Sequence, residues 1–171
     1  IQRNNTAAFL KVSEELQAKG VIVTDIQTAI RDHADLVEKY YMTTAVKVDE
    51  HKLTAYHAAL VNGGVFVYVP RNVIVEAPIQ VVFIHDNAEA SLFNHVLIVA
   101  EQSSAVTYVE TYISTVAEAK GQLNVVTEVI AKDNAQVTFG AVDNLTVGFT
   151  AYANRRGHAE RDAKIDWALG L

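Results

Sequence analysis

Cysteine is absent from the sequence, and its absence excludes several kinds of chemistry. Disulfide bonds, thiolate nucleophiles, Cys-ligated zinc and Cys-ligated iron–sulfur clusters all require cysteine side chains. Such a sequence fits a reducing compartment, and we expect a cytoplasmic protein. Long apolar runs are also absent, since stretches such as VVFI (81–84) and VLIVA (96–100) are too short to cross a bilayer. We therefore expect no membrane-spanning segment.

Basic residues are fewer than acidic ones, with 14 Lys and Arg against 20 Asp and Glu and a formal net charge of −6. Nucleic-acid binding relies on clustered Lys and Arg, so we expect no nucleic-acid partner. The one adjacent basic pair, Arg155 and Arg156, is interpreted as a solvated turn. Half of the residues are hydrophobic, which is typical of a globular chain. The missing initial Met and the apolar end WALGL lead us to expect a fragment of a larger protein.

Proline occurs only at positions 70 and 78, and both lie in the stretch GGVFVYVPRNVIVEAPIQVVF (63–83). Proline cannot donate a hydrogen bond to a β-ladder, so it belongs at strand ends or corners. The stretch therefore predicts strands in VFVYV, VIV and IQVVF, with corners at Pro70–Asn72 and Ala77–Pro78.

The first 62 residues predict a small α/β region with short helices. Ser13 begins a helix that stops at Gly20, and the run 21–23 reads as a strand. Thr24 then opens a capping box with Gln27, and Asp32 opens a helix over the next residues. The last expected helix begins at Leu53 and ends at Gly63. The expected apolar stripes are Leu36, Val37, Tyr40 and Tyr41 on one helix and Leu53, Tyr56 and Leu60 on the other.

From Val65 onward the hydrophobic period is two, as in strands, and no helical pattern intervenes, which excludes βαβ units. Turn residues such as EQSS, KDN and RRGH bound the runs. The expected strands are VFVYV, VIV, IQVVFIH, HVLIVA, AVTYVE, LNVVTEVIA, AQVTFGAV, LTVGFTAYA and AKIDWALG.

A repeat emerges when these runs are stacked, because pairs of apolar residues recur at alternate positions with spacings of roughly 30 residues. Residues two apart point to the same side of a strand, so the pairs would line a continuous interior. The pattern favours a β-solenoid over an antiparallel sandwich, whose strands come closer together. The pairs are Ile79 and Val81, Val106 and Tyr108, Val137 and Phe139, and Ile165 and Trp167.

The histidines form no recognised zinc motif. His51 and His57 are six apart, His85 and His95 are ten apart, and HxH, HxxxH and HExxH are missing. His57 is interpreted as a residue on a helix surface or at an interface. Signatures of serine nucleophiles and phosphate loops are also missing, and Ser103 and Ser104 read as a turn.

Carboxylates recur along the expected strands at Glu110, Glu128, Asp143 and Asp166. A polysaccharide-cleaving β-helix would array carboxylates in this way, but we interpret them as the polar half of alternating strands. Tyr108, Phe139 and Trp167 could form a sugar-binding platform, although their apolar partners favour a place in the core. We therefore assign no catalytic, cofactor-binding or metal-binding residue and expect no enzyme.

Several stretches closely resemble the SufB/SufD family of iron–sulfur cluster assembly proteins. The most specific is NGGVFVYVPRNV followed by PIQ. The others are VIVTDIQTAIRDHADLVEKYY (21–41), LTAYHAALVNGGVFVYVPRNVIVEAPIQVVF (53–83), HVLIVAEQSSAVTYVE (95–110) and RRGHAERDAKIDWALG (155–170).

Departures from the SufB pattern favour the SufD branch. Thr111 and Tyr112 stand where the SufB branch carries Gly-Cys-Thr-Ala-Pro. Of the polar positions proposed for sulfur transfer in that branch, Asn144 is shared and Arg155 replaces a lysine. The Gln and Trp of the same motif are replaced by Asp143 and Leu145, which argues against a sulfur-conducting role.

The resemblance implies a mainly β protein: a right-handed parallel β-helix over 63–171, preceded by an α/β N-terminal region over 1–62. It also implies a scaffold or accessory subunit that works with a SufB-like paralogue and a SufC-like ATPase. We expect no cofactor in this stretch, because the intact complex would handle the iron–sulfur cluster. Open strand edges at the end of the coil lead us to expect self-association. The alternatives are a β-helical carbohydrate-active enzyme and a cupin-like jelly-roll metalloenzyme.

Overall fold

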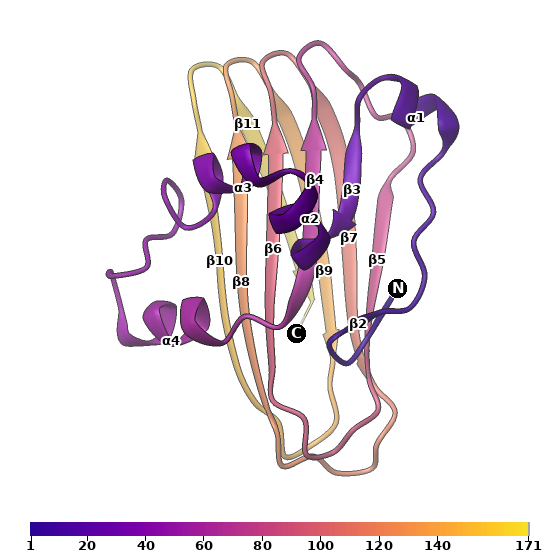
Figure 1. Ribbon diagram of the computed structural model, residues 1–171, viewed down its shortest axis with the longest axis vertical. Coiled ribbons are helices and arrows are strands. Elements are labelled where there is room, and N and C mark those ends of the chain that lie inside the picture. Colours follow the sequence, from indigo (N-terminus) through magenta and orange to yellow (C-terminus); the bar gives the residue numbers. More distant parts are fainter. Residues whose placement is uncertain (171) are drawn as a thin grey trace.

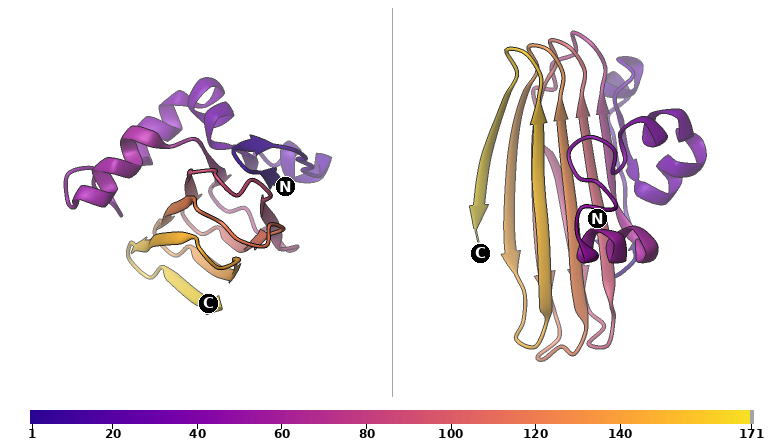
Figure 2. Two further views of the ribbon diagram at one scale, coloured as in Figure 1. Left: turned by 90° about the horizontal axis from the view of Figure 1, so that it is seen from below. Right: turned by 90° about the vertical axis from the view of Figure 1, so that its left-hand side faces the viewer.

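The computed structural model describes residues 1–170, and its larger part is a coil of parallel strands (Figure 1). Successive strands alternate between two sheets, and within each sheet every strand from one coil pairs in parallel with the equivalent strand of the next. One sheet contains β4 (Gly63–Val69), β6 (Leu92–Ala100), β8 (Gln122–Ala131) and β10 (Thr150–Ala159). The other contains β5 (Ile79–His85), β7 (Ala105–Ser114), β9 (Gln136–Asn144) and β11 (Lys164–Gly170). The left view of Figure 2, which looks along the strands, shows the coils lying one above another.

The parallel pairing confirms the β-solenoid and excludes the antiparallel sandwich. Val106 and Tyr108 lie opposite Val137 and Phe139, which in turn face Ile165 and Trp167, as the repeat predicts. Ring centroids of Tyr108 and Phe139 are 5.4 Å apart, and those of Phe139 and Trp167 are 4.8 Å apart. Tyr108 and Phe139 are fully buried. Tyr108 and Phe139 therefore belong to the core, as expected, whereas Trp167 is 37% exposed and the core prediction for it was wrong.

The first pair of the predicted repeat is placed two residues out of register. Ile79 lies opposite Tyr108, so Val81 lies opposite Glu110 and Phe83 opposite Tyr112. A shift of two keeps a side chain on the same face of a strand. Periodicity could therefore find the inward face of β5 but not its register.

The corners of the coils repeat one backbone conformation. Asn72, Ser103, Asn134 and Asp162 all have positive φ angles of 56–62°. Each of the first three donates its backbone N–H to a carbonyl of the corner in the next coil, at 2.9–3.0 Å. Asn and Asp tolerate this left-handed conformation better than most residues, and they occur at three of these four corners.

The proline corners are where the sequence predicts them, but the segment between them is not a strand. β4 ends directly before Pro70, and β5 begins directly after Pro78. The predicted strand VIV (73–75) forms a single bridge, between Ile74 and Ala105, and Ile74 is 61% exposed. With only one residue paired, this segment is a connection between the two sheets.

The last predicted corner is wrong. The sequence RRGH (155–158) lies within β10. Most of the predicted strand LTVGFTAYA (145–153) lies before the first residue of β10. β10 is held in place by pairing with β8 along its whole length, from Thr150 opposite Gln122 to Ala159 opposite Ala131. Backbone pairing with β8 thus overrides the turn preference of Arg155–His158, and the actual corner follows at 160–163.

The N-terminal residues add strands to both sheets and helices to the outside. β1 (Gln2–Arg3) pairs with β5 and with β2 (Thr6–Ala7), and β3 (Ile22–Asp25) pairs antiparallel with β4. The helices are α1 (Glu14–Ala18), α2 (Ile26–Asp32), α3 (Ala34–Tyr40) and α4 (Lys52–Leu60). Helices α2 and α3 cover the outer face of the β4–β6–β8 sheet, where Phe66, Leu97 and Ile130 pack against Ile26, Val37 and Tyr40 (Figure 2).

Two of the predicted helix starts are displaced. Ser13 caps α1 through a hydrogen bond from the Leu16 N–H, as expected. Thr24 does not cap α2, because it is part of β3 and pairs with Phe66 of β4. Asp25 caps the helix instead. Asp32 ends α2 and does not open α3, whose first residue is Ala34. Strand pairing thus explains the later start of α2, whereas α3 starts later because Asp32 is still part of α2.

Helix α4 turns its polar side inward, contrary to the prediction from its apolar spacing. Thr54 and His57 are fully buried, whereas Tyr56 and Leu60 are 41% and 42% exposed. Leu53 is half-buried. The surface beneath α4 supplies hydrogen-bonding partners for His57, so polar contacts set the orientation of this helix.

The boundary predicted at residue 62 coincides with the link between α4 and β4. Strands of the N-terminal residues nevertheless join both sheets, and whether 1–62 and 63–171 fold separately stays a prediction. None of the helices within residues 1–170 has the length and apolarity that a membrane crossing needs.

Candidate functional site

An ion cluster lies inside the β-helix, where Glu110 of β7, Asp143 of β9 and Arg155 of β10 meet. The Arg155 guanidinium donates to Asp143 Oδ1 at 2.9 Å and to Glu110 Oε1 at 3.4 Å. The Tyr108 hydroxyl donates to Glu110 Oε2 at 3.2 Å. The Glu110 side chain is fully buried and that of Arg155 is 7% exposed. A single guanidinium group thus contacts both carboxyl groups.

Burial governs the electrostatics of this cluster. It raises the pKa of Glu110 to about 7, against the lowering effect of the Arg155 charge and the Tyr108 hydroxyl. Burial also raises the pKa of the Tyr108 and Tyr112 hydroxyls well above their usual value, so both remain protonated. The cluster can therefore bind or release a proton at Glu110 near neutral pH.

Other polar atoms line the same interior without a hydrogen-bond partner among residues 1–170. They are the Tyr112 hydroxyl, the Thr127 hydroxyl, Asn94 Nδ2 and Arg155 Nε. Buried polar atoms normally have partners, so unpaired ones mark a polar band within an otherwise aliphatic coil.

The sequence predicted exposed positions for Glu110 and Arg155, and both predictions were wrong. Glu110 was interpreted as part of an outer polar face, and Arg155 as part of a turn. Glu110 shares its parity along β7 with Val106, Tyr108 and Tyr112, which all point inward. That parity was a usable sequence signal for a buried carboxylate. Asp166 does lie on an exposed face, where it pairs with Lys164 at 2.9 Å.

The positions identified through the family resemblance are only partly brought together. Tyr112 is buried and stacks on Phe83, with ring centroids 4.4 Å apart. Asp143 and Arg155 form the ion pair described above, whereas Asn144 is exposed at the end of β9. Leu145 packs against the edge of the core.

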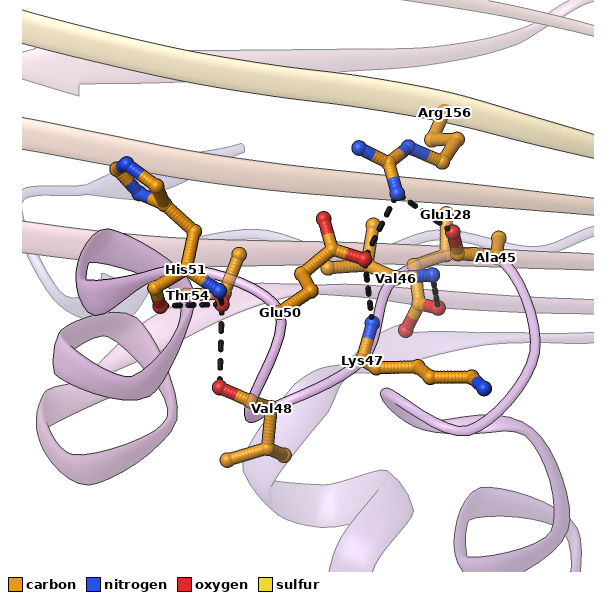
Figure 3. Close-up of polar contacts among 9 residues, drawn as sticks. All are labelled: Ala45, Val46, Lys47, Val48, Glu50, His51, Thr54, Glu128 and Arg156. Carbon is orange, nitrogen blue, oxygen red and sulfur yellow. Dashed lines mark hydrogen bonds and ion pairs between the residues drawn. The ribbon is translucent and has the colours of Figure 1, made fainter.

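A second polar cluster fixes the N-terminal residues to the outside of the coil. Residues 41–51, here called the strap, connect α3 to α4 and pass over β8 and β10 (Figure 3). The buried Glu128 carboxylate accepts the Met42 N–H at 2.6 Å and the Val46 N–H at 2.9 Å. Arg156, one strand further along, donates to the Ala45 carbonyl at 3.3 Å and to Glu50 Oε2 at 2.8 Å.

Two histidines extend the Glu128 cluster toward α4. His95 Nε2 of β6 lies 3.2 Å from Glu128 Oε1, and His95 Nδ1 lies 3.2 Å from His57 Nε2. His57 Nδ1 lies 3.1 Å from Asn124 Oδ1. Burial lowers the pKa of His57 to about 3 and lowers that of His95.

Sequence reasoning missed this cluster. His57 was expected on a helix surface or at an interface and Glu128 on an exposed strand face, yet both are fully buried. His51 does not join them, because its Nδ1 accepts the Leu53 N–H at the start of α4. Within residues 1–170 no group of three or more His, Cys, Asp or Glu side chains could hold a metal ion.

His85 is buried, and its imidazole ring makes no hydrogen bond with any of residues 1–170. It stacks on Tyr112 with ring centroids 5.8 Å apart, and neither ring nitrogen has a partner among the described residues. Burial lowers the pKa of His85 to about 4.

We expect His85→Phe to leave the protein at least as stable at pH 7 and less sensitive to acid. The unfolded chain gains a proton at His85 near pH 6.5 but the folded chain only near pH 4, so wild-type stability falls as the pH drops through this window. The loss amounts to about 3 kcal/mol at full extent. Urea unfolding at pH 4.5 and pH 7 measures it, and equal acid sensitivity in both proteins would contradict the prediction.

An apolar groove of about 480 Å³ lies between the N-terminal segment and β5, with Val23, Val65, Pro78 and Val81 among its walls. Asp25 is the carboxylate among its described lining residues, and it is occupied as the cap of α2. A glycosidase needs two carboxyl groups across the bond that it cleaves. The groove therefore does not support the carbohydrate-active alternative.

The fold and its polar clusters define a class of protein: a parallel β-helix with a docked helical N-terminal region and an ion cluster inside the coil. Residues 4–81 match the family model of the SufBD protein N-terminal region. Residues 83–171 match that of the SUF system FeS cluster assembly, SufBD core domain. The chain therefore belongs to the SufBD family, and the resemblance seen in its sequence is confirmed.

Curated relatives agree with this assignment. The iron–sulfur cluster assembly protein SufD of Bacillus subtilis is 63% identical over 172 residues, which cover the whole chain and 39% of that relative. SufBD family proteins of Staphylococcus saprophyticus and Staphylococcus haemolyticus are 26% identical over 169 residues, or 36% of their length. The chain thus spans less than half the length of these relatives, and it is more similar to this SufD protein than to the two staphylococcal proteins.

Proposed function

We propose that this chain is part of an accessory scaffold subunit of a SUF-type iron–sulfur cluster assembly complex. The observation that carries the proposal is the 63% identity to a SufD protein along the whole chain. A β-helix supports such a role because its long faces and open strand edges can hold partner proteins in a fixed arrangement.

The same proposal makes the chain non-catalytic and cytoplasmic. The buried Tyr112 occupies the position at which the SufB branch carries its cysteine. The chain has no cysteine at any position. The iron–sulfur cluster would be handled by the intact complex, with no cofactor bound by this stretch. The carbohydrate-active alternative has no support from the comparisons.

The proposed partners are a SufB-like, cysteine-bearing paralogue and a SufC-like ATPase. Self-association of the chain remains a further prediction, for which the support is that β10 and β11 are edge strands within residues 1–170.

Co-purification from the native host tests the proposed partnership. We expect the tagged full-length protein to retain both a SufC-like ATPase and a cysteine-bearing paralogue in stoichiometric amounts. The matched control is the same tag on an unrelated protein of similar charge. Purification of the full-length protein without either partner would refute the assignment.

A further inference from the structure

The buried line of His57, His95 and Glu128 joins three elements that are far apart in the sequence. His57 comes from α4, His95 from β6 and Glu128 from β8, and their side chains lie between the N-terminal residues and the outer face of the coil. The line continues through Glu128 to the strap, because the same carboxylate accepts the Met42 and Val46 N–H groups. The position of α4 and that of the strap therefore depend on one set of contacts.

Counting protons shows that this line is incomplete when both histidines are neutral. Three polar approaches lie along it: His57 hydrogen-bonds to Asn124 at 3.1 Å and to His95 at 3.2 Å, and His95 Nε2 lies 3.2 Å from Glu128 Oε1 without the geometry of a hydrogen bond. Each approach brings two lone pairs together unless a proton lies between them. Two neutral imidazoles supply only two N–H groups. Rotating the Asn124 amide does not remove the demand at His57, which also faces the backbone carbonyl of Asn124. The docked arrangement therefore has a place for one further proton between these atoms. It has no place for a second.

The surrounding groups favour neutral histidines in the docked state. The Met42 and Val46 N–H groups occupy the two oxygens of Glu128. Burial lowers the pKa of His95 and outweighs the raising effect of the Glu128 carboxylate. The Tyr41 ring lies 4.2 Å from His95, and burial raises the pKa of its hydroxyl to about 12. Arg156 lies opposite Glu128 in the strand register, but its guanidinium is engaged with Ala45 and Glu50. Full burial penalises any net positive charge on the two rings.

We propose that His57, His95 and Glu128 form an acid-released latch that holds α4 and the strap against the β-helix. In the released state both histidines face water and each takes up a proton from solvent, whereas the docked pair has room for one at most. Release is therefore coupled to the net uptake of at least one proton. Acidification shifts the equilibrium toward release, because the state that binds more protons is favoured as the pH falls.

The apolar contacts of the strap oppose this release. Met42 and Val46 are buried against Val126 on the outer face of β8. These contacts keep the strap docked at neutral pH, and the charge on the histidines works against them in acid. The apolar contacts therefore hold the strap in place, and the latch makes its release depend on pH. Release would expose the outer face of the coil around His95 and Val126.

Hydrogen exchange of the full-length protein between pH 5 and pH 8 tests the latch. The readout is the exchange of residues 41–61, corrected for the intrinsic pH dependence, with β7 (residues 105–114) as internal reference. We expect the opening equilibrium of this segment to rise at least about tenfold per pH unit below pH 6.5, which is the slope of one net proton, and about a hundredfold where both rings are neutral in the docked state. The reference strand should show no such slope.

Three variants make the test specific. In His57→Gln/His95→Gln the slope should vanish. His51→Asn is the matched control, because it removes a nearby histidine yet keeps a capping acceptor for α4, and it should retain the slope. His57→Gln alone should show a smaller slope than wild type. If the double variant proves open at every pH, ¹⁵N-histidine NMR of the wild type decides: both rings should be neutral when docked and become charged as exchange increases.

Three results would overturn the proposal. The first is exchange in residues 41–61 that varies less than twofold between pH 8 and pH 5 in the wild type. The second is a wild-type slope in the double variant. The third is protection of the segment by one equivalent of zinc at pH 7, which would assign the facing nitrogens of His57 and His95 to a metal.

Discussion

Replacing Glu128 with glutamine is expected to destabilise the protein by about 2–3 kcal/mol, the size of effect seen when a buried donor loses its acceptor. Its carboxylate accepts two backbone N–H groups and contacts His95. A glutamine keeps one acceptor oxygen but turns an NH₂ group toward a donor. The loss should be accompanied by faster hydrogen exchange at Met42 and Val46.

Asp166→Asn is the matched control for this experiment. The sequence predicted exposed positions for both carboxylates, and Asp166 does lie on an exposed face, where Lys164 is its one ion-pair partner among residues 1–170. Exposed ion pairs contribute little, so we expect a change within about 0.5 kcal/mol. Urea unfolding of the two variants compares them directly. Equal effects on the free energy of unfolding would show that Glu128 does not anchor the strap.

Replacing Arg155 with methionine is expected to cost about 3 kcal/mol at pH 8 and clearly less at pH 5. The variant leaves Glu110 and Asp143 without their shared cation inside the coil. At pH 5 Glu110 is already protonated, because its pKa is about 7 even with Arg155 present. Removing the guanidinium raises the pKa of Glu110 further. Urea unfolding at the two pH values measures the difference.

The sign of the pH effect follows from the raised pKa of Glu110. The folded chain holds a proton at Glu110 up to about pH 7, whereas the unfolded chain releases it near 4.5. The stability gained from this proton is complete below 4.5 and is lost as the pH rises through 7, by about 3 kcal/mol in total.

Glu110→Gln is the variant that separates charge from packing in this cluster. It keeps the shape of the side chain and removes its titration, so stability should change less between pH 5 and pH 8 than in the wild type. In Glu110→Gln/Arg155→Met the cost of losing Arg155 should be smaller than in the single variant, because one of the two carboxylates is gone. An Arg155→Met cost that is the same at pH 5 and pH 8 would contradict the account.

The coil itself could be predicted from local patterns. Alternating apolar residues predict strands, and their recurrence predicts that these strands stack in parallel. The pairs Val106 and Tyr108, Val137 and Phe139 therefore lie in register as expected. Pro70 and Pro78 mark corners because a residue without an N–H group cannot continue a ladder.

The polar clusters could be predicted only in part. Glu110 has the parity of inward-facing neighbours, so its burial was accessible from the sequence. Arg155 was not, because the prediction of a turn at RRGH removed the strand that carries it. His57 and His95 are 38 residues apart and meet only once α4 docks on β6, so no local spacing could indicate their contact.

The sequence by itself determined that this chain forms short strands with alternating faces, that they coil, and that the chain resembles the SufBD family. Tertiary structure alone decided the register of β5, the inward side of α4 and the partners of Glu110 and Glu128. The physical reason is that alternation and turn preference act between neighbours in the chain. Register and charge pairing instead depend on contacts between distant segments, whose energies exceed those local preferences.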